Sequence, residues 1–302
     1  MRILLTGGSG FLGSALARQL HAGGHTLSLL LRPRSSLARL GDAAAGMAIG
    51  RCASDGDILA FVAAQRPDVV LHTACCYGRQ GETALQLLDA NLRLGVLLLQ
   101  ALQAVHAGTA QRGLLVHAAS ALPPGANAYA LSKAQFADWG RAGALAGGPR
   151  FLNLLLQHMY GPGDDAGKFS TQVLRACRSH QPVLALTAGT QRRDFIHVDD
   201  VVGAIDWLLQ PAVQARLADA DALDLGSGEA PTVRHFVETV HALTASRTRL
   251  DFGAIPYRPN EAMHCQADLT RLRSLGWTPR LGLREGLQQT LRAETPPCET
   301  LP

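Results

Sequence analysis

Charged residues are scarce in this chain, and long basic runs are missing altogether. Of the 302 residues, 17% are Asp, Glu, Lys or Arg, whereas soluble domains typically have roughly 25%. The formal net charge is +4 and no run of Lys or Arg forms a basic stripe. A nucleic-acid partner is therefore not expected.

Cysteine patterns typical of metal sites and redox motifs are also missing. None of the six cysteines forms C-x-x-C, and no Cys/His cluster has zinc spacing, so no metal is expected. The simplest expectation is reduced thiols in a cytoplasmic protein. No apolar run reaches about 18 residues and the N-terminus lacks the apolar stretch of a signal peptide, so no membrane association is expected.

Apolar residues, at 47%, are abundant enough to bury a sizeable core. Short runs without polar alternation predict buried strands, and helical stretches separate them. The strands are expected at 2–6, 25–31, 68–73, 113–118 and 150–157, and the helices near 11–22, 57–65 and 84–106. This alternation predicts an α/β fold with a doubly wound parallel sheet of the Rossmann type. The composition changes after Tyr160, so we expect the sheet domain at 1–159 and a smaller C-terminal substrate-binding lobe at 160–302, with some segments returning to the sheet domain.

A glycine motif follows the first predicted strand directly. Gly7, Gly10 and Gly13 form G-x-x-G-x-x-G, and Phe11 and Leu12 open the first helix. Gly7 and Gly10 allow a tight turn and close approach to a pyrophosphate, Gly13 allows close helix packing, and the helix N-terminus offers N–H donors. In this context the motif predicts a dinucleotide site; the alternative is a glycine turn without a ligand.

The loop after the second strand carries positive charge. An NAD site usually has an acidic residue here, whereas Arg accommodates the 2′-phosphate of NADP. Arg32, Arg34 and Ser35 therefore favour NADP(H), although NAD(H) remains possible. The alternative is that these arginines only decorate an exposed loop.

Tyr129 and Lys133 form Y-x-x-x-K, a spacing that puts both side chains on one face of a helix. A nearby ammonium is expected to lower the pKa of the phenol, so that the phenol can exchange a proton with a substrate. Ser120 follows the fourth strand and is expected to hold the same substrate oxygen. An isolated match to this pattern is often a surface helix, but the order of strand, Ser, Tyr and Lys favours catalysis.

Five further motifs occur in the order typical of one family. They are Asp89-Ala90-Asn91-Leu92, Tyr160-Gly161-Pro162-Gly163, Arg193-Asp194-Phe195 running on to Val198-Asp199-Asp200, Asp224-Leu225-Gly226-Ser227-Gly228-Glu229, and Leu275-Gly276-Trp277-Thr278-Pro279. With the glycine loop and the Tyr-Lys pair, they resemble the extended short-chain dehydrogenase/reductases, specifically the NAD-dependent epimerase/dehydratase family. The resemblance covers nearly the whole chain and implies a nucleotide-sugar-modifying oxidoreductase.

The resemblance also implies further site residues. The cofactor contacts would include Asp55, Thr73, Ala74, Asn91, Tyr129, Lys133 and His158, with Asn91 in a proton relay. The substrate contacts would be Cys76, Tyr77, Ser120, Arg193 and Arg258, the two arginines gripping a diphosphate. For Arg193 the alternative is a salt bridge to Asp194, Asp199 or Asp200, and for Arg258 it is an exposed loop charge. Asp199 and Asp200 are better explained as charges at a helix start than as metal ligands.

The segment from His72 to Arg79 resembles the CDP-abequose synthase-type 4-ketoreductases, which reduce a nucleotide-linked 4-keto deoxysugar with NADPH. The resemblance therefore implies the same reaction type and a homodimer. A 4-epimerase that retains NAD, or a non-catalytic NAD(P)-sensing protein, remain alternatives. Dehydratases usually place Asp-Glu beside the catalytic Ser, whereas Ala121 and Leu122 follow Ser120 here.

The chain departs from the family pattern in three places. Ser120 and Tyr129 are only nine positions apart, so the loop that usually frames the sugar is largely missing. His158 stands where relatives have Asn before the Y-G-P-G turn, and the adenine-contacting D-x-x-D is reduced to Cys52 followed by Asp55. These changes bear on the size of the substrate and on the orientation of the nicotinamide.

Overall fold

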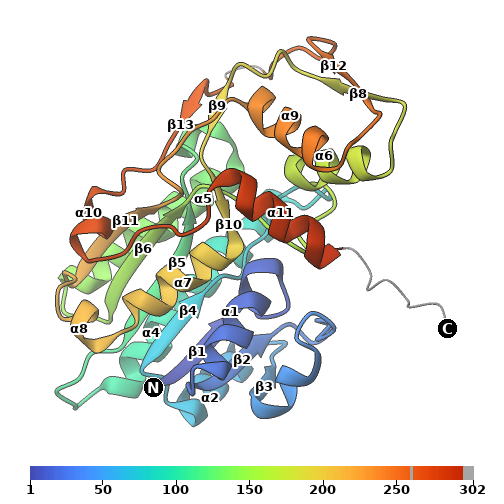
Figure 1. Ribbon diagram of the computed structural model, residues 1–302. Helices are drawn as coiled ribbons and strands as arrows, with labels where there is room; N and C mark the ends of the chain where they lie inside the picture. The colour runs from blue at the N-terminus through green and yellow to red at the C-terminus, as the bar shows by residue number, and fades with distance from the viewer. Residues whose placement is uncertain (259–260, 295–302) are drawn as a thin grey trace. The chain divides into compact units, whose positions relative to one another are not determined.

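The computed structural model describes residues 1–258 and 261–294, which form two compact units (Figure 1). Unit 1 comprises Met1–Leu156 and Ile205–Asp224. Unit 2 comprises Gln157–Ala204 and the chain from Leu225 onward. The first division thus lies three residues before the predicted boundary at 159/160, and the segment 205–224 returns to the sheet-containing unit.

A seven-stranded sheet forms the centre of unit 1, in the order β11-β6-β5-β4-β1-β2-β3. Its strands, in chain order, are β1 (Arg2–Thr6), β2 (Thr26–Leu31), β3 (Ala48–Arg51), β4 (Val69–His72), β5 (Leu114–Ser120), β6 (Arg150–Leu156) and β11 (Ala220–Leu225). The strands pair in parallel, for example Leu5 with Leu29 and with Leu71. Their apolar residues are buried on both faces, which is why they lack polar alternation. The predicted doubly wound parallel sheet is confirmed.

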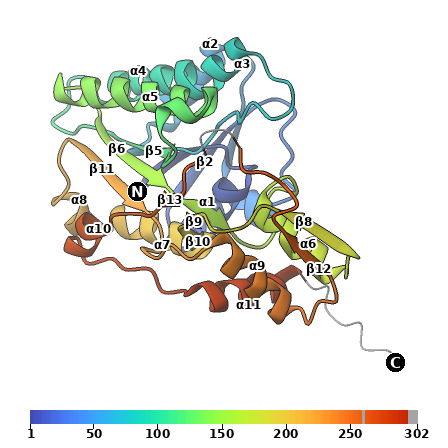
Figure 2. The same ribbon diagram turned by 90° about the horizontal axis from the view of Figure 1, so that it is seen from above.

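Helices cover both faces of this sheet. The helices of unit 1 include α1 (Phe11–Ala22), α2 (Asp55–Gln65), α3 (Ala84–Leu88), α4 (Leu94–His106), α5 (Ala128–Leu145) and α8 (Pro211–Gln214). Figure 2 shows α2, α4 and α5 layered on one face and α1 on the other. Leu98, Leu102, Phe136 and Phe151 pack into the core between this layer and the sheet.

The helical segment Ala84–His106 is long and apolar enough to cross a membrane by length and composition alone. The sequence expectation of no membrane span rests on uninterrupted apolar runs, and Asp89 and Arg93 interrupt this one. Leu98 and Leu102 of the segment are fully buried in the core. Because core helices pass the same test, the finding does not by itself indicate a membrane.

Unit 2 is built from short strand pairs and helices. β10 (Phe195–His197) pairs with β7 (His158–Tyr160), β12 (Arg249–Phe252) with β8 (Val183–Leu186), and β13 (His264–Cys265) with β9 (Arg192–Arg193), all in parallel. Its helices include α6 (Phe169–Arg178), most of α7 (Val198–Leu208), α9 (Val233–Leu243), α10 (Thr270–Ser274) and α11 (Leu283–Glu294). Tyr160, Phe195 and Phe236 anchor a separate core, in which the Phe195 and Phe236 rings stack with centroids 4.2 Å apart.

Candidate active site

The glycine loop turns as predicted between β1 and α1. Gly7 has φ +72°, and the Gly10 amide donates to the Gly7 carbonyl at 2.8 Å. A Cβ on Gly13 would lie 2.1 Å from the Gly7 oxygen, so only glycine allows α1 to begin this close to the loop. Gly10 is the N-cap of α1 and its position has no side-chain cap, which leaves the first helical N–H groups available to an anion.

Thr6, the last residue of β1, ties this loop to the end of β4. The Thr73 hydroxyl donates to the Thr6 carbonyl at 2.7 Å, and the Ala74 amide donates to the Thr6 hydroxyl at 3.2 Å. A Cβ on Gly7 would lie 2.7 Å from the Ala74 nitrogen. The structure therefore brings Gly7, Thr73 and Ala74 together, as the sequence predicts for a cofactor site.

The loop after β2 is braced by a residue that the sequence reasoning missed. Arg51, on β3, donates to the carbonyls of Pro33 and Ser35 at 2.7 and 2.9 Å. Arg32 and Arg34 are exposed in the same loop. The loop thus holds two exposed arginines on a backbone shaped by a third, and the signal that could have revealed Arg51 was the short strand β3, which was not predicted.

Asp55, the predicted adenine contact, lies at the start of α2. Its carboxylate pairs with the Arg93 guanidinium at 2.7 Å, and Arg93 also pairs with Asp89. If Asp55 contacts the adenine, its carboxylate must therefore bind both the adenine and Arg93.

Ser120, Tyr129 and Lys133 come together at the end of β5 and the start of α5. Ser120 is the last residue of β5, and its hydroxyl interacts with the Tyr129 phenol and lowers the pKa of that phenol. The side chain of Asn127 caps α5 by accepting from the Ala130 amide at 2.8 Å, which fixes the first helical turn that carries Tyr129. Lys133 lies one turn further on and is 2% exposed, and its Nζ has no hydrogen-bond partner among the described residues.

The electrostatics of this group differ from the sequence expectation. Burial raises the pKa of Tyr129 and the neighbouring Cys75 raises it further, while Arg79 and the Ser120 hydroxyl lower it. Burial also lowers the pKa of Lys133. The expectation that Lys133 lowers the pKa of Tyr129 is therefore wrong for these residues, because burial dominates and the opposing positive charge comes from Arg79.

Asn91, the predicted helix Asn, holds the loop that follows β4. It lies in η2 (Asp89–Arg93), a π-helical turn between α3 and α4, and is fully buried. Its amide accepts from the Cys76 nitrogen at 2.7 Å and donates to the Cys76 carbonyl at 2.8 Å and to the Ser132 hydroxyl at 2.9 Å. Asn91 thereby fixes Cys76 beside α5, and the predicted substrate residue Tyr77 lies over Tyr129 with ring centroids 4.9 Å apart.

Two histidines are buried beneath the catalytic group. His72 and His117 stack with ring centroids 5.6 Å apart, and the Thr6 hydroxyl lies 2.8 Å from His72 Nδ1. Burial, helped by the charge of Lys133, lowers the pKa of His72 to about 3, and the same causes hold the pKa of His117 well below its usual value. Both rings are therefore neutral near pH 7.

In unit 2, Arg193 is not free. It is buried and forms an ion pair with Glu261, and it also donates to the Arg192 carbonyl at 2.8 Å. The alternative partners Asp194, Asp199 and Asp200 were therefore the wrong ones, although an ion pair is present. Burial, with the nearby charges of Arg193 and Lys168, lowers the pKa of His158 to about 4.

Arg258 is exposed in a segment without regular secondary structure. Its carbonyl accepts a hydrogen bond from the Glu261 amide at 3.1 Å, which places it near the partner of Arg193. Within the described parts of the chain, no contact reserves its guanidinium for a structural role.

The acidic residues of the signature stabilise unit 2 internally. Asp194 is fully buried and accepts from the Ser227 amide and hydroxyl at 2.6 and 2.8 Å, from the Gly228 amide at 3.0 Å and from the Ala267 amide at 3.1 Å. Asp200 accepts from the amides of Arg280 and Leu281, both at 3.0 Å. Asp200 lies in the first turn of α7 as expected, but its hydrogen bonds join the helix to a segment about 80 residues away, which the helix-start interpretation did not foresee.

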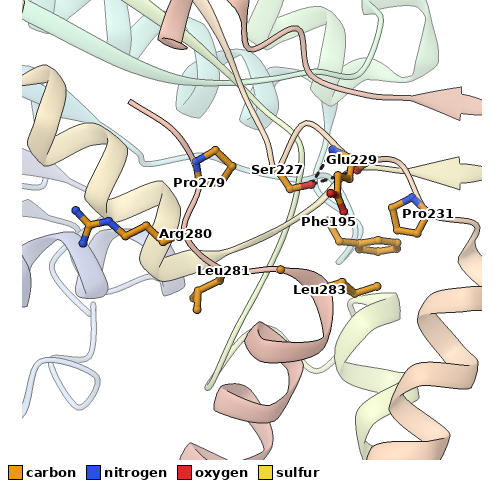
Figure 3. A pocket seen from close by; sticks show the side chains of 9 residues that line it. Phe195, Ser227, Glu229, Pro231, Pro279, Arg280, Leu281 and Leu283 are labelled. Atoms are coloured by element: carbon orange, nitrogen blue, oxygen red, sulfur yellow. Dashed lines mark hydrogen bonds between the residues drawn. The ribbon is translucent and has the colours of Figure 1, made fainter. Parts of the chain in front are cut away.

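A small cavity in unit 2 lies beside this network (Figure 3). It measures about 140 Å³ and is lined by Phe195, Ser227, Glu229, Pro231 and Pro279–Leu283. None of the predicted site residues lines it. Ligand pockets usually measure about 300–1,000 Å³, so this cavity is not a substrate site for a nucleotide-sugar.

The residues of unit 1 fit a nicotinamide dinucleotide. A Cβ would close the glycine cradle, the N-terminus of α1 has no side-chain cap, and the buried Lys133 ammonium lacks a partner among the described residues. The first two features suit a pyrophosphate, and the third suits the hydroxyls of a ribose.

Comparison with known proteins agrees with this geometry. Residues 3–218 match the model of the NAD-dependent epimerase/dehydratase family, so the chain belongs to that family. Its class is thus the extended short-chain dehydrogenase/reductases.

Among curated proteins, CDP-abequose synthase of Salmonella typhimurium (strain LT2) is 30% identical over 166 residues, 54% of this chain and 55% of that protein. The match thus spans about half the length of the CDP-abequose synthases. A putative GDP-L-fucose synthase of Oryza sativa subsp. japonica is 28% identical over 96% of this chain and 86% of its own.

Solved structures show the same fold. UDP-glucose 4-epimerase of Thermotoga maritima with UDP-glucose superposes with a TM-score of 0.84, at 19% identity, over 97% of this chain and 98% of the epimerase. UDP-glucose 4-epimerase of Thermus thermophilus in complex with NAD gives 0.81, at 22% identity over the same shares.

Proposed function

We propose that this protein uses NADPH to reduce a keto group on a nucleotide-activated deoxysugar, in the manner of a 4-keto-6-deoxy sugar reductase. The observation that carries the proposal is the placement of Ser120 at the end of β5 with Tyr129 and the buried Lys133 one helical turn apart on α5, where Lys133 Nζ has no partner among the described residues. These three groups are what a carbonyl reduction needs from the protein. The similarity to CDP-abequose synthase supports a nucleotide-linked deoxysugar as the substrate.

Each residue then has a defined role. A bound nicotinamide supplies the hydride. Ser120 donates a hydrogen bond to the carbonyl oxygen, and Tyr129 gives that oxygen a proton as negative charge develops on it. Lys133, with no competing partner in the described structure, holds the ribose of the cofactor.

The NADPH preference rests on the loop after β2. Arg32 and Arg34 are exposed there without an acidic residue beside them in the sequence, and Arg51 braces the loop. A 2′-phosphate would find planar guanidinium groups suited to it.

The test is a turnover screen of nucleotide-4-keto-6-deoxy sugars with NADPH and, in parallel, with NADH. Stoichiometric oxidation of NADPH with formation of the deoxysugar would support the proposal. Tightly bound NAD that survives purification, with interconversion of 4-epimers and no net consumption of cofactor, would support the epimerase instead. Cofactor binding without turnover of any sugar would favour a sensing protein.

We also propose a homodimer. Leu131, Trp139 and Leu145 lie on one exposed side of α5 and Leu85 is exposed on the neighbouring α3, an apolar surface that a second copy of the chain would cover. Sedimentation of the wild-type protein and of Trp139→Glu tests this: we expect a dimer that the substitution weakens, and a monomeric wild-type protein would contradict it.

A further inference from the structure

The loop between β4 and α3 carries two exposed side chains whose positions are set by buried neighbours. Asn91 makes two hydrogen bonds to the backbone of Cys76, one residue before Tyr77. Gly78 has φ +68°, and a Cβ there would lie 3.1 Å from Leu87, so the turn that leads on to Arg79 is suited to glycine. The backbone thus directs Tyr77 and Arg79 toward α5.

Three side chains from this loop and from α5 form a layered arrangement. The Tyr77 ring lies over the Tyr129 ring, with centroids 4.9 Å apart and an interplanar angle of 38°. The Arg79 guanidinium carbon lies 5.1 Å from the centroid of Tyr77. The guanidinium is therefore within about 10 Å of the Tyr129 ring, and both contacts have the geometry of favourable aromatic and cation–π interactions.

Besides burial, three groups influence the Tyr129 phenol from the elements packed around it. Cys75 and Arg79 belong to the β4–α3 loop and Ser120 to β5, whereas Lys133, on α5, is not one of them. Arg79 is the cation that lowers the pKa of Tyr129, whereas burial disfavours the charged form of Lys133 itself. Arg79 forms no ion pair with a carboxylate among the residues that the structure describes, so its charge is not neutralised by a neighbour there.

We propose that Arg79 is a positioning residue that acts on Tyr129 through Tyr77: its guanidinium holds the Tyr77 ring against the proposed catalytic phenol and keeps a permanent positive charge beside it. The charge of Lys133 depends on its protonation state, whereas an exposed arginine is always charged. This inference rests on the proposed function in that Tyr129 is the proton donor, but its physical content concerns the titration of one phenol.

The test titrates that phenol directly, without turnover. The 302-residue chain is labelled with difluorotyrosine, whose phenol is more acidic than that of tyrosine, and its four tyrosines are followed by fluorine NMR as a function of pH. Tyr→Phe variants assign the resonances. We expect Arg79→Gln to raise the titration midpoint of Tyr129 by about half a pH unit to one pH unit, since a nearby cation stabilises the phenolate.

The controls separate charge from structure. Arg79→Lys keeps the charge and should stay close to the wild-type midpoint, whereas Arg141→Gln removes an exposed arginine elsewhere on α5 and should leave it unchanged. If Arg79→Gln lowers the melting temperature, Arg79→Met repeats the test with a side chain that keeps an apolar stem on the Tyr77 ring. A midpoint in Arg79→Gln no higher than in Arg141→Gln, or equal midpoints in Arg79→Gln and Arg79→Lys, would overturn the proposal.

The outcome is independent of the proposed reaction. A chain that reduces no sugar but shows the shift would disprove the function and keep the coupling between Arg79 and Tyr129. An active reductase without the shift would disprove the coupling alone.

Discussion

In unit 1 the buried lysine of the catalytic group has no partner among the described residues, whereas in unit 2 the charged signature residues Arg193 and Asp194 are bound by their neighbours. Lys133 Nζ is buried and has no hydrogen-bond partner among the described residues of unit 1. In unit 2, Asp194 makes four hydrogen bonds and Arg193 is paired with Glu261. A buried group without a partner costs free energy unless a ligand satisfies it. Two family motifs can therefore have different roles. The Tyr-Lys motif of unit 1 is suited to a reaction with a ligand, whereas the Arg193-Asp194-Phe195 signature of unit 2 stabilises the fold of that unit.

The largest effect on activity should come from Tyr129, the proposed proton donor in unit 1. Replacing Tyr129 with Phe keeps the ring packed against Tyr77 but removes the proton donor, so turnover should fall by about 10²–10⁴. Fluorescence titration with NADPH should show nearly unchanged cofactor binding. Turnover close to wild type would remove Tyr129 from the mechanism.

Replacing Asp194 should show most clearly that the signature residues of unit 2 stabilise the fold. Asp194→Ala leaves the amides of Ser227, Gly228 and the buried Ala267 without their acceptor, and we expect a loss of about 3 kcal/mol in the free energy of unfolding. Urea unfolding measures it, and the exposed Asp138→Ala serves as a matched control. If the two variants were equally stable, the network around Asp194 would not stabilise unit 2.

Arg193 tests whether the comparison is too simple, because its ion pair does not exclude a role in binding. We expect Arg193→Ala to raise KM for a nucleotide-sugar about 10- to 100-fold with a smaller effect on kcat, since charge-assisted hydrogen bonds contribute about 1.5–3 kcal/mol. Glu261→Gln removes the partner but keeps the arginine, and should leave KM nearly unchanged. A lower melting temperature of Arg193→Ala at unchanged KM would assign Arg193 to architecture alone.

Arg32 and Arg34 are exposed residues of unit 1 with a proposed role in binding the cofactor. Their joint replacement by Ala should reduce the preference for NADPH over NADH about tenfold, because a phosphate loses its charge-assisted hydrogen bonds. Dissociation constants for both cofactors, with Arg141→Gln as the control, measure the change. Equal preference in the wild type and the double variant would mean that this loop does not contact a 2′-phosphate.

His72 predicts the mildest effect, on stability at acidic pH. Its pKa of about 3 in the folded chain is below the usual value of 6.5 in the unfolded chain. Between these values the unfolded state binds the additional proton, so the stabilisation is complete above pH 6.5 and is lost as the pH falls toward 3. The free energy of unfolding should drop by about 1.4 kcal/mol per pH unit for this residue.

Urea unfolding at pH values of about 7.5, 6.5 and 5.5, which bracket the onset of this protonation, checks the slope. We expect it to be shallower in His72→Asn than in the wild type, with His264→Asn, an exposed histidine, as the control. The same slope in all three proteins would show that His72 is not kept neutral by burial.

Local features were predictable from the sequence. The glycine loop, the Tyr129–Lys133 spacing and Ser120 at a strand end each depend on a few consecutive residues, and the structure places them as expected. The sheet was predictable because its strands are apolar on both faces, although β3 was missed because Ala48–Arg51 is only half-buried and ends in an arginine.

Long-range pairings were not predictable. Glu261 is 68 residues from Arg193, and nothing in either local sequence indicates the pair. The sign of the pKa shift of Tyr129 was missed because burial is a property of the folded environment, which a four-residue spacing does not contain. The same holds for the contact of Arg79 with Tyr77.

The return of residues 205–224 to unit 1 has a consequence for synthesis on the ribosome. β11 lies beside β6 at the edge of the sheet. When residue 156 has emerged, β6 is an edge strand with unpaired backbone groups, and it stays so until more than 60 further residues have been made. Unit 2 begins to form in that interval, so the nascent chain carries an incomplete sheet, and truncations near residue 160 should aggregate rather than yield an isolated nucleotide-binding domain.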